Sequence, residues 1–180
     1  MPPSARSIGT CLLVVSLLIR PWSGAVAASG GQTSEPPANV LSSVTFARAD
    51  QSKERAPLRV ESVGTGEKDL CMVKVHSASD KTIVSYTLAW KLTDVIVGNS
   101  GPHSGKKSLG SFAGSPVTTT LGPKKSEKTD LRQEIVKTVG TTIMAKQVKG
   151  MWMIVVGVKE VVFDDGTSWT GNPALFRSED

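Results

Sequence analysis

The segment from Thr82 to Lys91 constrains the fold more than any other part of the chain. Apolar residues alternate along it with small or polar ones, and the apolar set is Val84, Tyr86, Leu88 and Trp90. Such alternation places the two sets on opposite faces of an extended strand. The segment is therefore predicted to be a β-strand with one apolar face, and this is the clearest strand in the sequence.

Other short segments show the features of strands, and turn signals separate them. They are residues 44–46, 58–63, 71–75, 117–121 and 152–163. The last is predicted to be a central strand, with a tight turn at Asp164-Asp165-Gly166, and Gly157 is predicted to mark either a bulge or a close approach of another strand. Residues 77–81 form a polar connection of hairpin length. Residues 98–116 are rich in glycine and serine and are interpreted as a long loop.

Short strands at roughly 8–12-residue spacing predict an all-β fold. We expect an immunoglobulin-like antiparallel β-sandwich with at most one short helix. Residues 126–148 leave strand and helix open, because Leu131, Ile135 and Val139 have helical spacing whereas the Val/Thr-rich content favours strands. The predicted core consists of Val73, Val75, Tyr86, Leu88, Trp90, Ile154, Val156 and Phe163.

The first 28 residues have the organisation of a secretory signal peptide. Arg6 precedes the apolar run Thr10–Ile19, and small residues follow at Ala25–Ala28. We therefore expect a secreted or periplasmic protein after cleavage. The predicted divisions are a signal peptide (1–28), a flexible tether (29–43), a β-sandwich domain (44–170) and a frayed tail (171–180).

Cleavage would change both the charge and the cysteine content. Arg6 and Arg20 leave without any acidic residue, so the formal net charge falls from +5 to +3. Cys71 becomes the sole cysteine, which excludes an intramolecular disulfide and favours a small buried hydrophobe. No other segment is long and apolar enough to span a membrane, so no span is expected in the mature chain.

Two stretches, VKVHSASDKTIVSYTLAW (73–90) and VKEVVFDDGTSW (158–169), carry a resemblance. They resemble a loose group of secreted, uncharacterised bacterial proteins with an immunoglobulin-like β-sandwich. His76 stands where asparagine is common in that group. The matching motifs are packing and turn features, so the resemblance implies a fold and no activity.

The residues needed for catalysis are sparse. The chain has only two histidines, His76 and His103, and it lacks a G-x-S-x-G nucleophile motif. His, Cys and carboxylate residues are too scattered for a zinc site. We expect a protein without catalytic residues, metal or cofactor. The alternative from another class is a small extracytoplasmic hydrolase that uses His103 or the Asp164/Asp165 pair.

Positive charge gathers in residues 103–150, which hold nine lysines and arginines against three acids. The sequence therefore predicts a secreted non-catalytic binding or structural module that engages anionic partners. The candidate ligand-binding residues are His103, Lys106, Lys107, Lys124 and Lys125. Its partner could be a protein, a glycan or an anionic lipid head group. Nucleic acid is not expected, because the basic stretch lacks interleaved aromatic residues. A subunit of an envelope assembly, joined through a sheet edge, is a further alternative.

Overall fold

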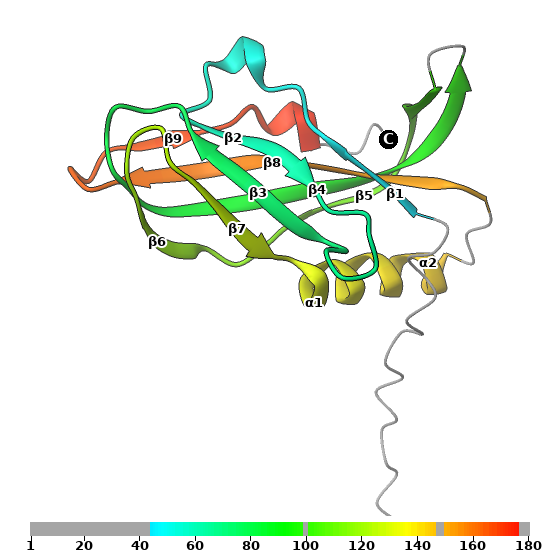
Figure 1. Cartoon of the computed structure of the whole chain (residues 1–180). Coiled ribbons are helices and arrows are strands. Elements are labelled where there is room, and N and C mark those ends of the chain that lie inside the picture. The colour runs from blue at the N-terminus through cyan, green and yellow to red at the C-terminus, as the bar shows by residue number, and fades with distance from the viewer. Residues whose placement is uncertain (1–43, 99–100, 147–149, 177–180) are drawn as a thin grey trace, which may run out of the picture. The chain divides into compact units, whose positions relative to one another are not determined.

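The computed structural model describes residues 44–98, 101–146 and 150–176, which form two β-sheets and one helical segment (Figure 1). The predicted signal peptide and tether lie outside the described residues. The nine strands are β1 (Val44–Arg48), β2 (Leu58–Val63), β3 (Met72–Ser77), β4 (Ile83–Gly98), β5 (Gly101–Ala113), β6 (Val117–Leu121), β7 (Ser126–Asp130), β8 (Trp152–Phe163) and β9 (Ser168–Thr170). The helical segment comprises α1 (Arg132–Ile135), a π-helical turn (Val136–Gly140) and α2 (Thr141–Ala145). Single 3-10 turns lie at Ser52–Glu54 and Pro173–Phe176.

The larger sheet is built around the long strands β4 and β8, which pair antiparallel from Ile83↔Phe163 to Asp94↔Trp152. On the far side of β8 lie β1 and β9, and on the far side of β4 lie β5 and β6. The prediction that 152–163 is a central strand is confirmed. Because β1 runs parallel to β8, the fold departs from the expected antiparallel sandwich at this strand.

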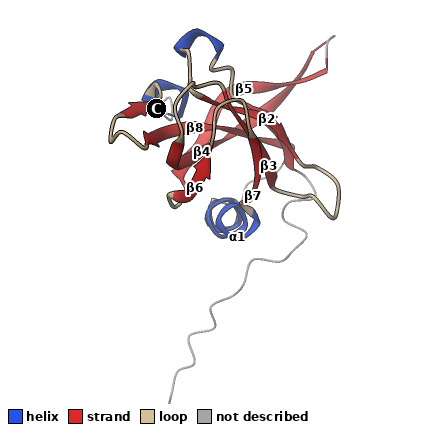
Figure 2. Ribbon diagram, turned by 60° about the vertical axis from the view of Figure 1, so that its left-hand side comes forward, coloured by secondary structure: helices blue, strands red, loops and turns tan. Residues whose placement is uncertain are grey.

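The smaller sheet has the order β2-β3-β7 and is antiparallel. Its inward side chains and those of the larger sheet form one core, which contains all eight predicted core residues. The Tyr86 hydroxyl of β4 hydrogen-bonds Thr129 of β7, so a polar contact also joins the sheets. The chain is thus mostly β, with two sheets facing one another (Figure 2).

The helical segment closes one side of this core and resolves the ambiguity of residues 126–148. The first five of them form β7, and a helical segment follows from Arg132 to Ala145. Its buried residues repeat with a helical period: Leu131, Ile135 and Val139. The Trp90 indole N–H donates to the Thr138 hydroxyl at 3.1 Å, which fixes the helical segment against β4.

The polar connection 77–81 is not a hairpin, because β3 and β4 belong to different sheets. The Ser77 N–H bonds the Lys125 carbonyl, and the Ala78 N–H bonds the Pro57 carbonyl. Both edges of β3 are thus already paired, one with β2 and the other with β7. Because β3 has no free edge, β4 cannot pair with it and lies in the other sheet.

The prediction of a long loop over 98–116 is wrong for most of its length. Residues 101–113 form β5, which pairs with β4 from Ala89↔Ala113 to Gly98↔Gly101. The intrinsic strand preference of glycine and serine is low, but pairing with a long neighbouring strand overrides it. The pairing is irregular between Thr93 and Val95, where β5 carries extra residues.

Of the two alternatives for Gly157, the bulge is wrong: Gly157 pairs with Ala89, and the bulge of β8 lies at Lys159. Glu160 pairs with Thr87 and Val158 with Leu88, so Lys159 is the extra residue. A second irregularity follows Ile83 in β4, which buries Ile83 and leaves Val84 only half-buried. The predicted Asp164-Asp165-Gly166 turn is confirmed, with Gly166 at φ +78°.

None of the helices in the described ranges combines the length and the apolar character that crossing a membrane requires.

Candidate anion-binding face

The outward side of the β2-β3-β7 sheet carries a cluster of charged and polar side chains. Alternation along each strand points inward residues such as Val73 and Val75 into the core and leaves their neighbours outside. Register then brings outward residues from three strands together. Arg59 pairs with His76, which pairs with Ser126, and Lys74 pairs with Lys128.

Glu61 is the anionic member of this cluster. It is the extra residue of a bulge between Val60 and Ser62 in β2. Its carboxylate lies 2.7 Å from the Lys74 ammonium nitrogen. The hydrogen bond from Lys74 is the largest cause that lowers the pKa of Glu61, so Glu61 is ionised at neutral pH.

Ser126, His76 and Glu61 have the residue types of a catalytic triad but not its geometry. The His76 Nδ1 atom lies 3.0 Å from the Ser126 Oγ atom and 3.8 Å from the Glu61 Oε1 atom. A triad requires two ring nitrogens, one facing the nucleophile and the other facing the acid. Here a single nitrogen faces both groups. The cluster therefore lacks the relay that would activate Ser126.

Two of the cations in this cluster have no acidic partner. Within the described part of the chain, neither Arg59 nor Lys128 has a carboxylate within 4 Å. Lys74 and Lys128 lie directly opposite each other on antiparallel strands. Two like charges in such a cross-strand pair repel each other and destabilise the sheet. The Glu61 carboxylate already offsets the charge of Lys74, so Lys128 is the member of the pair that has no acidic partner among the described residues.

A small hollow lies beside this lysine pair. Its volume is about 120 Å³, and its lining includes Ser62, Gly64 and Asp69 in addition to Lys74 and Lys128. Its rim is tightly closed, because a Cβ atom at Gly64 would lie 2.0 Å from the Asp69 carbonyl oxygen. The lining holds two lysines and one aspartate, so its formal charge is +1.

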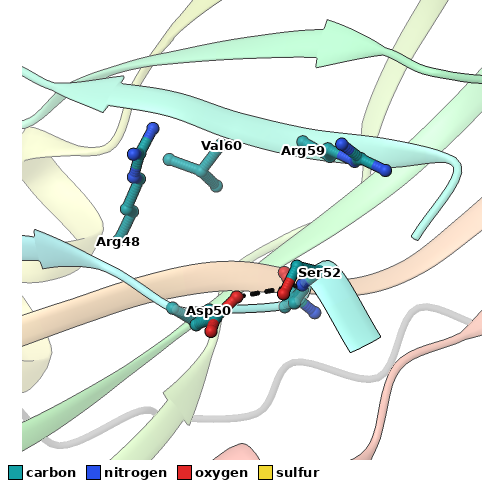
Figure 3. Close-up of a pocket in the computed structure, with 7 residues that line it drawn as sticks. Arg48, Asp50, Ser52, Arg59 and Val60 are labelled. Carbon is teal, nitrogen blue, oxygen red and sulfur yellow. Dashed lines mark hydrogen bonds between the residues drawn. The ribbon is translucent and has the colours of Figure 1, made fainter. Parts of the chain in front are cut away.

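A larger groove of about 460 Å³ opens next to β2, between that strand and the segment that follows β1. Arg59 and Val60 line it from β2, whereas Asp50 and Ser52 line it from the opposite side (Figure 3). Arg48 extends from β1 and donates to the Glu61 carbonyl at 3.3 Å. Hydrogen bonds from the Ser52 hydroxyl and N–H lower the pKa of Asp50, so Asp50 is ionised at neutral pH. The groove is therefore lined by two guanidinium groups, of Arg48 and Arg59, and one carboxylate.

The sequence-predicted residues divide between two distant places. Lys124 and Lys125 are exposed in the β6–β7 turn, next to Ser126 and the charged face. Lys107 is exposed on β5, and the backbone of His103 and Lys106 lies on the same strand. Leu121 pairs with Ile83 and Ser108 pairs with Thr93, so about 33 Å of β4 separates the β6–β7 turn from Lys107. They do not form one surface.

The residues that sequence reasoning missed are Arg48, Arg59, Lys74 and Lys128. Alternation along residues 58–63 and 71–75 does put Arg59 and Lys74 outside the core. No local signal shows that Lys128 lies opposite Lys74, because that depends on the pairing of β3 with β7.

The residues considered for hydrolysis and metal binding lie elsewhere. The Asp165 carboxylate accepts hydrogen bonds from the Lys81 ammonium group at 2.6 Å and from the Thr167 hydroxyl. These bonds, first of all the one from Lys81, hold the pKa of Asp165 well below its usual range. The His103 side chain is outside the described part. Among the described residues, no group of three or more His, Cys, Asp and Glu side chains could hold a metal ion.

Cys71 is fully buried at the start of β3, as its apolar surroundings predict. Burial raises the pKa of its thiol to about 11, so the reactive thiolate is suppressed at neutral pH. Its φ of +66° is unusual for a residue other than glycine. Cys71 therefore belongs to the packed core and contributes nothing to the charged face.

Comparison with known proteins gives no family assignment. No protein-family model matches the chain, and no curated protein does either. Among solved structures, the chain is similar to a hypothetical protein from Peptoclostridium difficile 630, determined by X-ray crystallography. The identity is 13%, the match covers 69% of this chain and 93% of that chain, and the TM-score is 0.26. A likeness at that TM-score carries no argument about fold or function.

Proposed function

We propose that this protein is a secreted or periplasmic, non-catalytic binding module that holds an anionic ligand on the outward face of the β2-β3-β7 sheet. In this proposal the two facing sheets are an immunoglobulin-like sandwich of the kind found in the group that residues 73–90 and 158–169 resemble. The ligand we favour is an acidic polysaccharide, whose regularly spaced charges suit a group of cations. Neither a metal nor a cofactor is part of the proposal.

The observation that carries the proposal is the group of cations on the three strands. Lys74 of β3 lies opposite Lys128 of β7, and Arg59 of β2 lies opposite His76, two residues along β3 from Lys74; neighbouring strands are about 4.8 Å apart. Arg59 and Lys128 are exposed and have no acidic partner in the described residues. Lys124 and Lys125 extend the group at the adjacent turn, and Arg48 extends it into the groove.

The geometry of the face favours binding over hydrolysis. The only His–Ser contact in the described residues uses one ring nitrogen for both the serine and the acid. The histidine and glutamate side chains are about one-third exposed, on an open sheet face. A polymer that lies flat on an open face can contact several cations at once.

The test is a binding titration with heparin as the sulfated probe, polygalacturonate as the carboxylated probe and dextran as the neutral one. Arg59→Ala combined with Lys128→Ala is expected to weaken binding of the preferred probe roughly tenfold, which corresponds to about 1.4 kcal/mol. The wild-type affinity should fall as salt is added, because salt screens exposed charges.

Lys137→Ala combined with Lys159→Ala is the matched control, because both residues are exposed and lie away from the charged face. This control should bind like the wild type. Equal losses in the two double variants would show that only net charge matters. Equal affinity of the wild type for dextran and the acidic glycans would overturn the proposal.

A further inference from the structure

Exposed apolar side chains gather at one end of the fold, far from the charged face. The large apolar residues that are exposed among those described are Ile96 (52%), Val97 (74%), Met144 (47%) and Met151 (57%). Met151 directly precedes Trp152, which pairs with Asp94 near Ile96. Met144 lies in α2, and Lys146 at the end of α2 donates to the Leu109 carbonyl of β5. All four exposed apolar side chains therefore lie at the end of the larger sheet where β8 begins.

The most exposed pair lies on a two-stranded arm. The pairing of β4 with β8 ends at Asp94, but β4 and β5 remain paired from Val95↔Ser104 to Gly98↔Gly101. The arm projects beyond the rest of the larger sheet (Figure 1). Successive residues of a strand point to opposite faces, so Ile96 and Val97 place one exposed apolar side chain on each face of the arm.

Basic side chains lie at the base of the arm. Lys107 is exposed, and its N–H donates to the Asp94 carboxylate at 3.0 Å, which puts it at the level of Asp94. Lys146 is exposed and contacts β5 at Leu109, close to the Thr93↔Ser108 pair. Val97 is three residues beyond Asp94, so the apolar part of the arm extends about 10 Å past the lysines.

We propose that this arm docks on an anionic lipid bilayer, with Ile96 and Val97 entering the interfacial layer and Lys107 and Lys146 contacting acidic head groups. An apolar projection of about 10 Å with cations at its base matches the depth and charge of that layer. Lipid surrounds an inserted arm, whereas a flat protein surface would cover only one of its faces. A shallow insertion also leaves the unpaired strand edges among polar head groups.

Vesicle flotation tests the proposal. The protein used is the chain from Ser29, which contains every described element, and thermal melts confirm that each variant is folded. The wild type is expected to bind vesicles of phosphatidylcholine with 30% phosphatidylglycerol. It is expected not to bind vesicles that contain only phosphatidylcholine. Ile96→Ser combined with Val97→Ser should lower the bound fraction about tenfold. Lys137→Ala combined with Lys159→Ala is the control, because both residues are exposed and belong to neither the arm nor the charged face, and this variant should float like the wild type.

An insertion readout separates docking from simple charge attraction. Val97→Cys labelled with the fluorophore NBD should shift to shorter wavelength on the acidic vesicles, while the same label at Lys128→Cys should not. Cys71 is buried and stays unlabelled in the folded protein. Unshifted NBD at position 97, equal binding to both vesicle types, or a dimer in sedimentation that Ile96→Ser abolishes would overturn the proposal. The heparin titration is independent of all three results.

Discussion

At the scale of single residues, Gln51 is a buried polar side chain that joins two segments far apart in the sequence. It is 6% exposed, and it lies in the short segment between β1 and β2. Its amide donates to the Val158 carbonyl at 2.8 Å and accepts from the Val158 N–H at 2.8 Å. The Gln51 amide thus satisfies the two backbone groups of Val158 that a neighbouring strand would otherwise pair with, next to the Lys159 bulge.

Gln51→Leu is expected to lower the free energy of unfolding by about 2–3 kcal/mol. The variant would leave the N–H and the carbonyl of Val158 buried without partners, which costs more than losing an exposed hydrogen bond. Urea denaturation followed by tryptophan fluorescence measures this change. Gln133→Leu is the control, because Gln133 is exposed on α1, and it should change the free energy of unfolding by less than about 0.5 kcal/mol. An unchanged urea midpoint for Gln51→Leu would refute the role assigned to Gln51.

At the scale of elements, the base of the β4–β5 arm depends on a close approach between Gly105 and Asp94. A Cβ atom at position 105 would lie 1.9 Å from the Asp94 Oδ1 atom. That oxygen also accepts the hydrogen bond from the Lys107 N–H. The extra residues of β5 at this point are therefore held by one carboxylate.

Gly105→Ala is expected to loosen the arm more than the core. The new methyl group would displace the Asp94 carboxylate and remove its hydrogen bond to Lys107, a global cost of about 1 kcal/mol. Hydrogen exchange should become faster at Val95–Val97 and stay unchanged in β8. Gly66→Ala is the control, since no atom lies within 4 Å of a Cβ atom there. Unchanged exchange in the arm would contradict this account of the bulge.

At the scale of the described fold, protection should be centred on β4 and β8. Each of these strands has paired neighbours on both sides, and their inward residues include the fully buried Trp90, Ile154 and Val156. In the smaller sheet only β3 has two neighbours. In the described fold, the larger sheet therefore has two strands with neighbours on both sides, whereas the smaller sheet, which carries the charged face, has one.

Native-state hydrogen exchange should accordingly be slowest at residues 86–92 and 154–158. Amides of β2 and β7 should exchange earlier, because edge strands open without disrupting the core. The arm residues beyond Asp94 should be the fastest of any described strand. Slower exchange in β2 and β7 than in β8 would show that the smaller sheet is the stable one.

The sequence by itself determined features that depend on near neighbours. Alternation correctly assigned Tyr86, Leu88 and Trp90 to the core, but it did not show that Thr87 and Ala89 on the opposite face are buried as well. The Asp164-Asp165-Gly166 turn was also predictable, because it needs only residues that tolerate positive φ. The same alternation assigned Lys74 to the outside.

Only the tertiary structure decided which strands pair. It separated β3 from β4, made a strand of the glycine-rich residues 101–113 and placed Lys128 opposite Lys74. It also divided the basic stretch between two distant surfaces. The physical reason is that a strand's backbone groups can be satisfied by many partners, and the choice among them depends on how the whole chain closes around its core.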